Sequence, residues 1–124
     1  MWNSLILIFI GGGLGSVLRF IIGHYVSKKV ESGIPWGTLI VNILGSFLLG
    51  AIIGYVDKMN WTSSQYIVFF TIGFCGGFTT FSTFSIENAM LIKNGDWVLF
   101  LSYTLLSIII GILTAFGGFL LLKG

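Results

Sequence analysis

Residues Gly73–Phe84 read GFCGGFTTFSTF, and they lie inside a long apolar segment that runs from Tyr66 to about Met90. A segment of that length can span a bilayer, since a transmembrane helix needs about 20 mostly apolar residues. Its middle does not suit a continuous helix. Each glycine lowers helix stability by about 1 kcal/mol relative to alanine, and the two threonines favour a cap or a break. The sequence therefore predicts two half-helices joined by an unwound link near Gly76–Thr80.

The predicted link lies close to the middle of the span. Non-helical backbone at that depth persists only where it is buried in protein or lines a polar cavity. Half-helix ends that meet there are a recurrent way to hold ions. The alternative is a plain contact between small residues, which is common in membrane bundles. The polar and aromatic run Thr79–Phe84 favours the ion site.

The whole chain has the composition of an integral membrane protein. Of its 124 residues, 56% are hydrophobic and 8% are charged, whereas a soluble domain carries about 25% charged residues. Four apolar stretches are long enough to cross the membrane: about Leu5–Val26, Trp36–Tyr55, Tyr66–Met90 and Trp97–Leu122. The expected fold is all-α, a single transmembrane domain of four helices over residues 1–124, with the third helix broken near its middle.

The composition also argues against several classes of function. The net charge of +2 includes no basic run that would bind nucleic acid. Cys75 is the single cysteine, so it forms neither an intrachain disulfide nor a cysteine-based metal cluster. The sequence shows no nucleophile–base pair and no metal-ligand set that would indicate an enzyme. We expect neither nucleic-acid binding nor catalysis.

The charges near the predicted membrane surfaces leave the orientation open. Four spans would place Lys58 and Lys123 on the side of the termini, and Lys28, Lys29 and Lys93 on the other side. The positive-inside rule needs an excess on one side, and here the two sides nearly match. Dual topology and a single orientation set by the slight excess at the first loop are equally compatible with these charges.

Each predicted helix carries a line of polar or small residues at helical spacing. These residues are Gly12, Ser16, Arg19 and Gly23 in the first helix, Thr38, Asn42 and Ser46 in the second, Thr83 and Glu87 after the break, and Tyr103, Ser107, Gly111 and Thr114 in the fourth. Most of the polar side chains can donate hydrogen bonds, and Glu87 is the one carboxylate inside a predicted span. A cation path more often shows acidic rings. The pattern favours a path for a small anion.

Four residues have a more specific expected role. Arg19 inside the membrane indicates a polar vestibule that attracts anions, although such an arginine can also extend to the headgroups. Asn42 can donate N–H groups to an anion, or it can bind a neighbouring helix. Phe81 and Phe84 share a face and can turn their positive ring edges toward an anion. Ordinary packing is the alternative for both rings.

A homodimer is expected, because four short helices cannot easily surround a path by themselves. If the two copies insert in opposite directions, their two-fold axis lies in the membrane plane and the two links can meet on it. Carbonyl groups of Gly76–Thr80 from both copies would then form a small oxygen cage, which suits a hard monovalent cation.

Three motifs together resemble the Fluc, or CrcB, family of small fluoride channels: GGGLGSVLR at 11–19, GTLIVNILG at 37–45 and GGFTTFSTF at 76–84. The resemblance covers the whole chain, and the third motif is its most specific part. One departure is Phe20, where the family often has tyrosine. The resemblance implies a fluoride-selective channel of the plasma (inner) membrane that lets fluoride leave the cell passively and so lowers fluoride toxicity.

The resemblance also implies an antiparallel homodimer of dual topology with two fluoride pores. It implies a structural sodium ion at the dimer interface, held by the backbone carbonyls of Gly76 and Thr79 from both copies. Fluoride contacts are implied for Asn42, Phe81 and Phe84. The predicted fluoride pathway further includes Thr38, Ser82, Thr83, Glu87, Tyr103 and Ser107, with Arg19 as the vestibule arginine.

The main alternative is a small proton-coupled exporter of drugs or other cations, which can also be tiny, four-helical and dual in topology. Such an exporter needs a carboxylate in the membrane, and the candidate, Glu87, lies beyond the glycine-rich centre of its span. A noncatalytic helper subunit is a third interpretation. The polar lines on several helices argue against it, because a helper needs only one binding face.

Overall fold

The computed structural model describes residues 1–29, 33–60 and 64–124, and it is helical over most of them. The elements in chain order are α1 (Trp2–Lys29), α2 (Trp36–Met59), α3 (Gln65–Val68), the π-helix η1 (Phe69–Cys75), α4 (Gly76–Phe78), α5 (Ser82–Lys93) and α6 (Trp97–Lys123). Four of the described segments are long and apolar enough to cross a membrane: Trp2–Ser27, Trp36–Met59, Gln65–Lys93 and Trp97–Lys123. The predicted all-α fold with four spans is confirmed.

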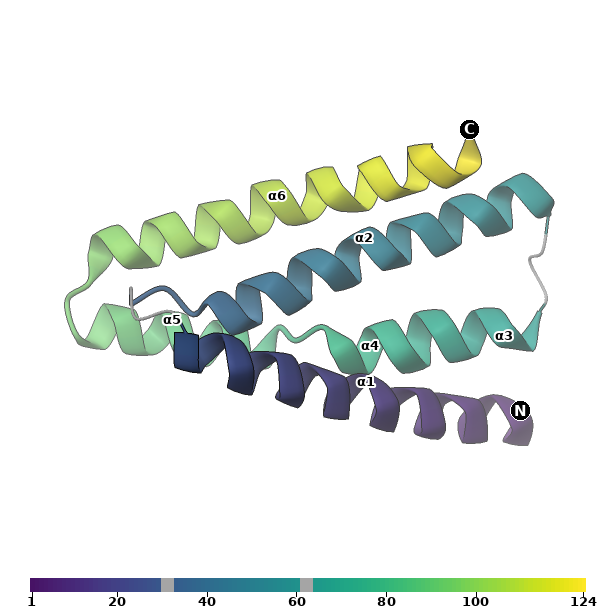
Figure 1. Ribbon diagram of the computed structural model, residues 1–124, viewed down its shortest axis with the longest axis horizontal. Coiled ribbons are helices and arrows are strands. Elements are labelled where there is room, and N and C mark those ends of the chain that lie inside the picture. Colours follow the sequence, from purple (N-terminus) through teal and green to yellow (C-terminus); the bar gives the residue numbers. More distant parts are fainter. Residues whose placement is uncertain (30–32, 61–63) are drawn as a thin grey trace.

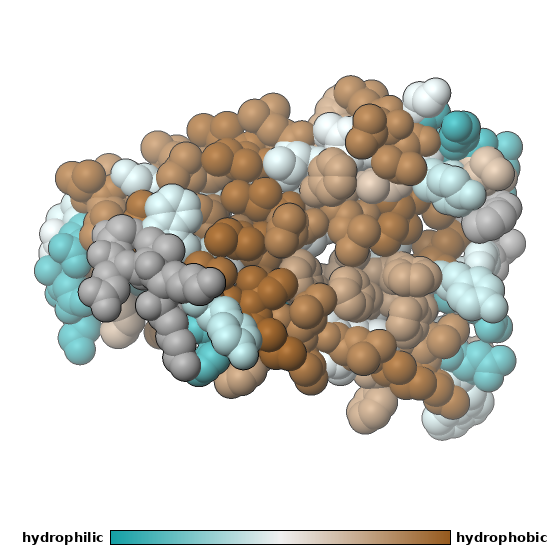
Figure 2. Space-filling view, in the orientation of Figure 1, coloured by the Kyte–Doolittle hydropathy of each residue, from teal (hydrophilic) through white to brown (hydrophobic). Residues whose placement is uncertain are grey.

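The four spans lie side by side as long rods, and both termini lie at the same end of the bundle (Figure 1). Figure 2 shows a broad apolar middle with hydrophilic side chains gathered at the two ends. At the end that holds the C-terminus, Lys123 Nζ lies 3.3 Å from Asp57 Oδ2, and both side chains are exposed. This distribution fits a bundle whose middle lies in lipid and whose ends meet water.

Glycines bring the spans together in two long close pairs, and α1 also meets α2 at Gly23 and Gly37. In the first pair, α1 packs along η1 and α4, where a Cβ on Gly15 would lie 2.8 Å from the amide nitrogen of Phe78. In the second pair, α2 packs along α6, where a Cβ on Gly50 would lie 2.7 Å from the carbonyl carbon of Ala115. Small residues therefore let the backbones touch, as is common between membrane helices.

The third span is interrupted between α4 and α5 (Figure 1). The helix α4 ends at Phe78, Thr79 is extended with φ −87° and ψ 160°, and α5 begins at Ser82. The predicted break near the middle of this span is confirmed. Its predicted position, Gly76–Thr80, is wrong for the part from Gly76 to Phe78, which is helical.

The glycines of this span have a different task from the one predicted. A Cβ on Gly77 would lie 2.9 Å from the Cα of Gly12, and a Cβ on Gly73 would lie 3.3 Å from the Cα of Gly11. These two glycines therefore allow α1 to approach while the backbone stays helical. The break follows only at the threonines, where side-chain acceptors replace the helical hydrogen bonds.

The π-helix η1 is a feature that the sequence did not predict. It covers Phe69–Cys75, and the hydroxyl of Thr71 donates to the carbonyl oxygen of Ile67 at 2.7 Å near its start. Segments of π-helix are rare and occur often at functional sites. This one directly precedes the short helix that leads into the break.

Candidate functional site

The break is held by hydrogen bonds that redirect two backbone amides. In a continuous helix, the amide of Thr80 would donate to the carbonyl of Gly76, and the amide of Thr83 would donate to the carbonyl of Thr79. Here the Thr80 amide donates to Asn42 Oδ1 at 2.8 Å. The Thr83 amide donates to Thr80 Oγ1 at 3.2 Å. The carbonyls of Gly76 and Thr79 thus lose the donors that a helix would supply.

Asn42 on α2 binds the break from one side. Its Nδ2 donates to the carbonyl of Thr80 at 3.0 Å while its Oδ1 accepts the amide of the same residue. Both ends of the side-chain amide are therefore used, and one Nδ2 hydrogen remains for a further partner. These two hydrogen bonds join α2 to the third span, in agreement with the alternative in which Asn42 binds a neighbouring helix.

Arg19 on α1 binds the end of α4, just before the break. Its Nε donates to the carbonyl of Gly77 at 3.0 Å, and Ser16 Oγ donates to the same oxygen at 3.4 Å. The Gly77 carbonyl comes from the last turn of α4, where a helix leaves carbonyls without an internal partner. A cation there also offsets the partial negative charge of the helix end. Arg19 thus lies inside the bundle, bound to the backbone.

Glu87 on α5 lies between two hydroxyl donors. Thr38 Oγ1 on α2 donates to Glu87 Oε2 at 2.9 Å, and the hydroxyl of Tyr103 on α6 donates to Oε1 at 2.9 Å. Tyr103 is fully buried, and its ring centroid lies 5.1 Å from that of Phe84. Buried polar groups need such partners, so this cluster joins three helices through one carboxylate.

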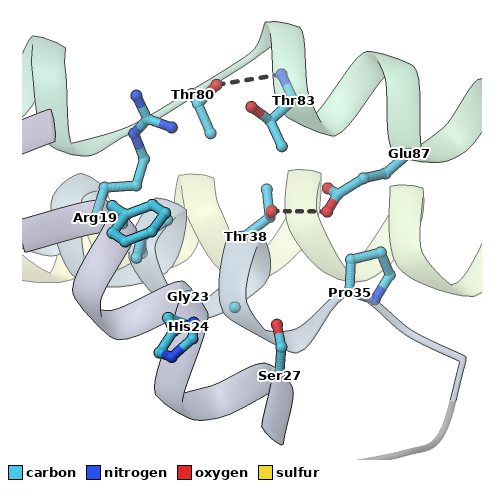
Figure 3. A pocket seen from close by; sticks show the side chains of 12 residues that line it. Arg19, Gly23, His24, Ser27, Pro35, Thr38, Thr80, Thr83 and Glu87 are labelled. Carbon is cyan, nitrogen blue, oxygen red and sulfur yellow. Dashed lines mark hydrogen bonds between the residues drawn. The ribbon is translucent and has the colours of Figure 1, made fainter. Parts of the chain in front are cut away.

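Two cavities flank the break. The first, the Arg19 cavity, measures about 510 Å³ and is lined by Arg19, Phe20, Gly23, His24, Ser27, Pro35, Gly37, Thr38, Val41, Thr80, Thr83 and Glu87. Figure 3 shows how α1, α2 and α5 surround it, with the Thr38–Glu87 and Thr80–Thr83 hydrogen bonds along its wall. The second, the Asn42 cavity, measures about 330 Å³ and is lined by Asn42, Gly45, Ser46, Leu49, Thr79, Thr80, Phe81, Phe84, Ser107 and Ile108.

The structure divides the predicted pathway residues between these cavities. The Arg19 cavity collects Arg19, Thr38, Thr83 and Glu87, and the Asn42 cavity collects Asn42, Phe81, Phe84 and Ser107. Tyr103 lies behind Glu87 and reaches neither lining, and the exposed Ser82 lies outside both. On α6, the predicted polar line is only partly directed at a cavity, because Thr114 Oγ1 donates to the carbonyl of Gly111 at 3.1 Å.

The Asn42 cavity combines an unused hydroxyl with two phenylalanine rings. Ser107 Oγ is buried and has no hydrogen-bond partner among the described residues. The ring centroids of Phe81 and Phe84 lie 5.9 Å apart, and Phe81 is 78% exposed in the single chain. A ring so exposed is available to a second molecule or to a path beside the chain.

Two residues were missed by the sequence reasoning. Thr80 lies on both cavities, whereas the sequence indicated for it only a cap or break and a carbonyl near the dimer axis. Its position three residues before Thr83, at the start of α5, is the spacing of a helix cap and could have identified it. The hydroxyl of Thr104 is buried and without a partner in the described part of the chain, three positions before Ser107.

The comparisons with known proteins agree with these features. The family model described as "CrcB-like protein, Camphor Resistance (CrcB)" matches residues 6–119. A "Fluoride-specific ion channel FluC" from Leptospira interrogans is 42% identical over 121 residues, which cover 98% of this chain and 95% of the relative. Proteins of the same name from Gloeothece citriformis and Phocaeicola vulgatus are 41% and 44% identical, over 97% and 90% of this chain and 97% and 91% of the relatives. With four spans, a broken third span and a match over nearly its whole length, the chain belongs to the CrcB family.

Proposed function

We propose that this chain forms a fluoride-selective channel in the plasma membrane, through which fluoride leaves the cell passively and its toxicity falls. The observation that carries the proposal is the donor-lined Asn42 cavity beside a helix break within the membrane-spanning segment Gln65–Lys93. The names of the curated relatives support fluoride as the ion. The four apolar spans support a multi-pass membrane setting.

The chemistry of the Asn42 cavity suits a small anion. Fluoride gives up strongly bound water when it leaves bulk solvent, so donors must replace that water. The free hydroxyl of Ser107 and the second Nδ2 hydrogen of Asn42 are such donors. The rings of Phe81 and Phe84 add positive edges without adding a charge that would hold the anion too tightly.

The Arg19 cavity is proposed to be the entrance to this path. The guanidinium of Arg19 lies on its lining and carries a permanent positive charge, which raises the local concentration of anions. Thr80 lines both cavities, so both of them border the break. Thr38, Thr83 and Glu87 form a polar wall of this entrance, in which the Thr83 hydroxyl can donate to an anion while the Thr38 hydroxyl donates to Glu87. Glu87 keeps both of the hydrogen bonds that it accepts, from Thr38 and from Tyr103.

A structural sodium ion is proposed where two antiparallel copies meet at the break. The carbonyls of Gly76 and Thr79 fit such an ion, because the amides that a helix would direct at them donate to Asn42 and Thr80 instead. Carbonyl oxygens are good ligands for a hard monovalent cation. The bound ion would supply positive charge at the dimer axis. The antiparallel dimer is part of the same proposal, since one copy offers only half of the ligands.

A proton-coupled exporter fits the geometry less well. Its carboxylate would have to exchange a proton with solvent and substrate at each turnover. Glu87 accepts hydrogen bonds from Thr38 and Tyr103, one on each carboxylate oxygen. A carboxylate whose two oxygens both accept hydrogen bonds is held in one position, and this suits a fixed part of a cavity wall better than repeated exchange of protons and substrate.

The proposal is tested with liposomes that contain only this protein and concentrated fluoride. We expect rapid fluoride efflux once a potassium ionophore balances the charge, and no comparable flux of chloride. Asn42→Ala serves as the loss-of-function variant, and it should still run as a dimer on size exclusion. Efflux that requires a proton gradient would favour the exporter instead, and an absence of fluoride efflux from well-folded protein would refute the proposal.

A further inference from the structure

Thr80 is the residue on which the hydrogen bonds of the break converge. Its amide donates to Asn42 Oδ1 at 2.8 Å, and its carbonyl accepts from Asn42 Nδ2 at 3.0 Å. Its side-chain oxygen accepts the amide of Thr83 at 3.2 Å and so caps the start of α5. Backbone and side chain are thus engaged at once, by α2 on one side and by α5 on the other.

The Thr80 hydroxyl competes with a backbone carbonyl for one donor. Without it, the acceptor that a regular helix would supply for the Thr83 amide is the carbonyl four residues earlier, that of Thr79, and this bond would extend α5 toward its start. A carbonyl that accepts this amide offers less electron density to a cation. Asn42 Oδ1 acts in the same way for Gly76, since it takes up the amide of Thr80.

We infer that Thr80 is a positioning residue for the sodium ion, with Asn42 as its partner, and that together they withhold two amides from the carbonyls of Gly76 and Thr79. This inference rests on the proposed sodium site. The Thr80 side chain does not touch the ion in this scheme. It acts through Thr83, by keeping the Thr79 carbonyl out of the helical ladder.

The arrangement links the cation to the anion path. Asn42 lines the second cavity and holds both backbone groups of Thr80, while Thr80 lies on both cavities. A change that loosens Thr80 would therefore weaken sodium binding and disturb the Asn42 amide at the same time. A substitution elsewhere on the wall, such as one at Ser107, would alter fluoride contacts without affecting the sodium site.

The test measures sodium binding through dimer stability rather than through flux. Purified dimer is heated at increasing sodium concentration, with N-methylglucamine replacing sodium at constant ionic strength. The half-point is recorded as the sodium concentration at which the site is half occupied, where sodium stabilises the dimer by RT ln 2. Thr80→Val removes the acceptor at nearly unchanged volume. We expect its half-point to rise about fivefold per copy, the usual effect of losing a threonine cap, and about 25-fold for an ion shared by two copies. Thr80→Ser keeps the acceptor and should stay within about twofold of wild type.

The outcomes distinguish the inferred role of Thr80 from the proposed sodium site on which it rests. A wild-type dimer whose stability ignores sodium would overturn the sodium site itself. A wild type that responds to sodium while Thr80→Val keeps the same half-point would overturn only the role of Thr80, even if the variant is less stable at every concentration. If Thr80→Val does not assemble, Thr80→Ser and Thr80→Asn decide, because both keep a capping oxygen. A half-point raised more than about fivefold in both would refute the inference, and a wild-type half-point in either would support it.

Discussion

Gly15→Ala tests the contact between α1 and the third span. The added methyl carbon would lie 2.8 Å from the amide nitrogen of Phe78 and 3.2 Å from the carbonyl carbon of Gly77. The carbonyl oxygen of Phe74 lies closer still, and ordinary contacts begin at 3.4 Å, so the two backbones must separate by more than about 0.6 Å. Both sides of the contact are helix backbone, which cannot turn away as a side chain would. Overpacking of this kind costs about 1–3 kcal/mol.

The separation would also reach the break. Arg19 lies one turn after Gly15, and its Nε donates to the carbonyl of Gly77 at 3.0 Å. A separation of more than about 0.6 Å carries this pair beyond about 3.6 Å, which is too long for a hydrogen bond. A hydrogen bond to a charged group is worth about 1.5–3 kcal/mol. We therefore expect a lower thermal midpoint and a fluoride efflux reduced by about tenfold or more, measured by scanning fluorimetry and by the liposome assay.

Gly13→Ala is the matched control for this change. It adds the same methyl group to the same helix, but its Cβ meets no atom within 4 Å. Its only intrinsic effect on the single chain is the gain in helix propensity, about 1 kcal/mol, so its thermal midpoint should equal or exceed that of wild type. An equal loss in both variants, or wild-type behaviour of Gly15→Ala, would refute the reasoning from close contact.

Three further changes test other parts of the site. Tyr103→Phe removes the donor that lies 2.9 Å from Glu87 Oε1, and we expect fluoride efflux to fall about tenfold because a charge-assisted bond is lost; unchanged efflux would leave the ring as a packing group only. Phe81→Ile keeps an apolar side chain without a ring edge, and it should sharply reduce efflux while the dimer elutes normally, whereas full efflux would make Phe81 a packing residue. Asn94→Cys in a Cys75→Ala background should react with an impermeant thiol reagent from both sides of a cell membrane, and labelling from one side alone would contradict dual topology.

The spans were predictable because length and hydropathy decide whether a segment crosses a bilayer. The position of the break was less predictable from the sequence. Glycine weakens a helix, but it also lets a second helix approach, and Gly77 does the latter against Gly12. Which of these two effects prevails depends on the residues that face the glycine in the folded bundle, and these cannot be read from the sequence. Thr80 caps α5 through its side chain, in line with the expectation that the two threonines favour a cap or a break.

The partners of the polar side chains could not be predicted from the sequence. Asn42 and Arg19 were identified because amides and guanidinium groups are costly at bilayer depth. Their hydrogen bonds join residues 38 and 58 positions apart, so they depend on how the spans are placed. The antiparallel dimer and its sodium ion stay predictions, because a single chain presents only half of that interface.

The two close helix pairs have a mechanical consequence. Where backbone touches backbone, as α1 does with α4 and α2 with α6, little soft material remains between the helices to be compressed. Each pair therefore moves as one stiff body. The bonds from Asn42 to Thr80 tie the α2–α6 body to the break that follows α4, and the bond from Thr38 to Glu87 ties it to α5 beyond the break. Hydrogen-bond lengths vary over only about 0.5 Å, so these bonds limit how far the α2–α6 body can move away from the third span at the break.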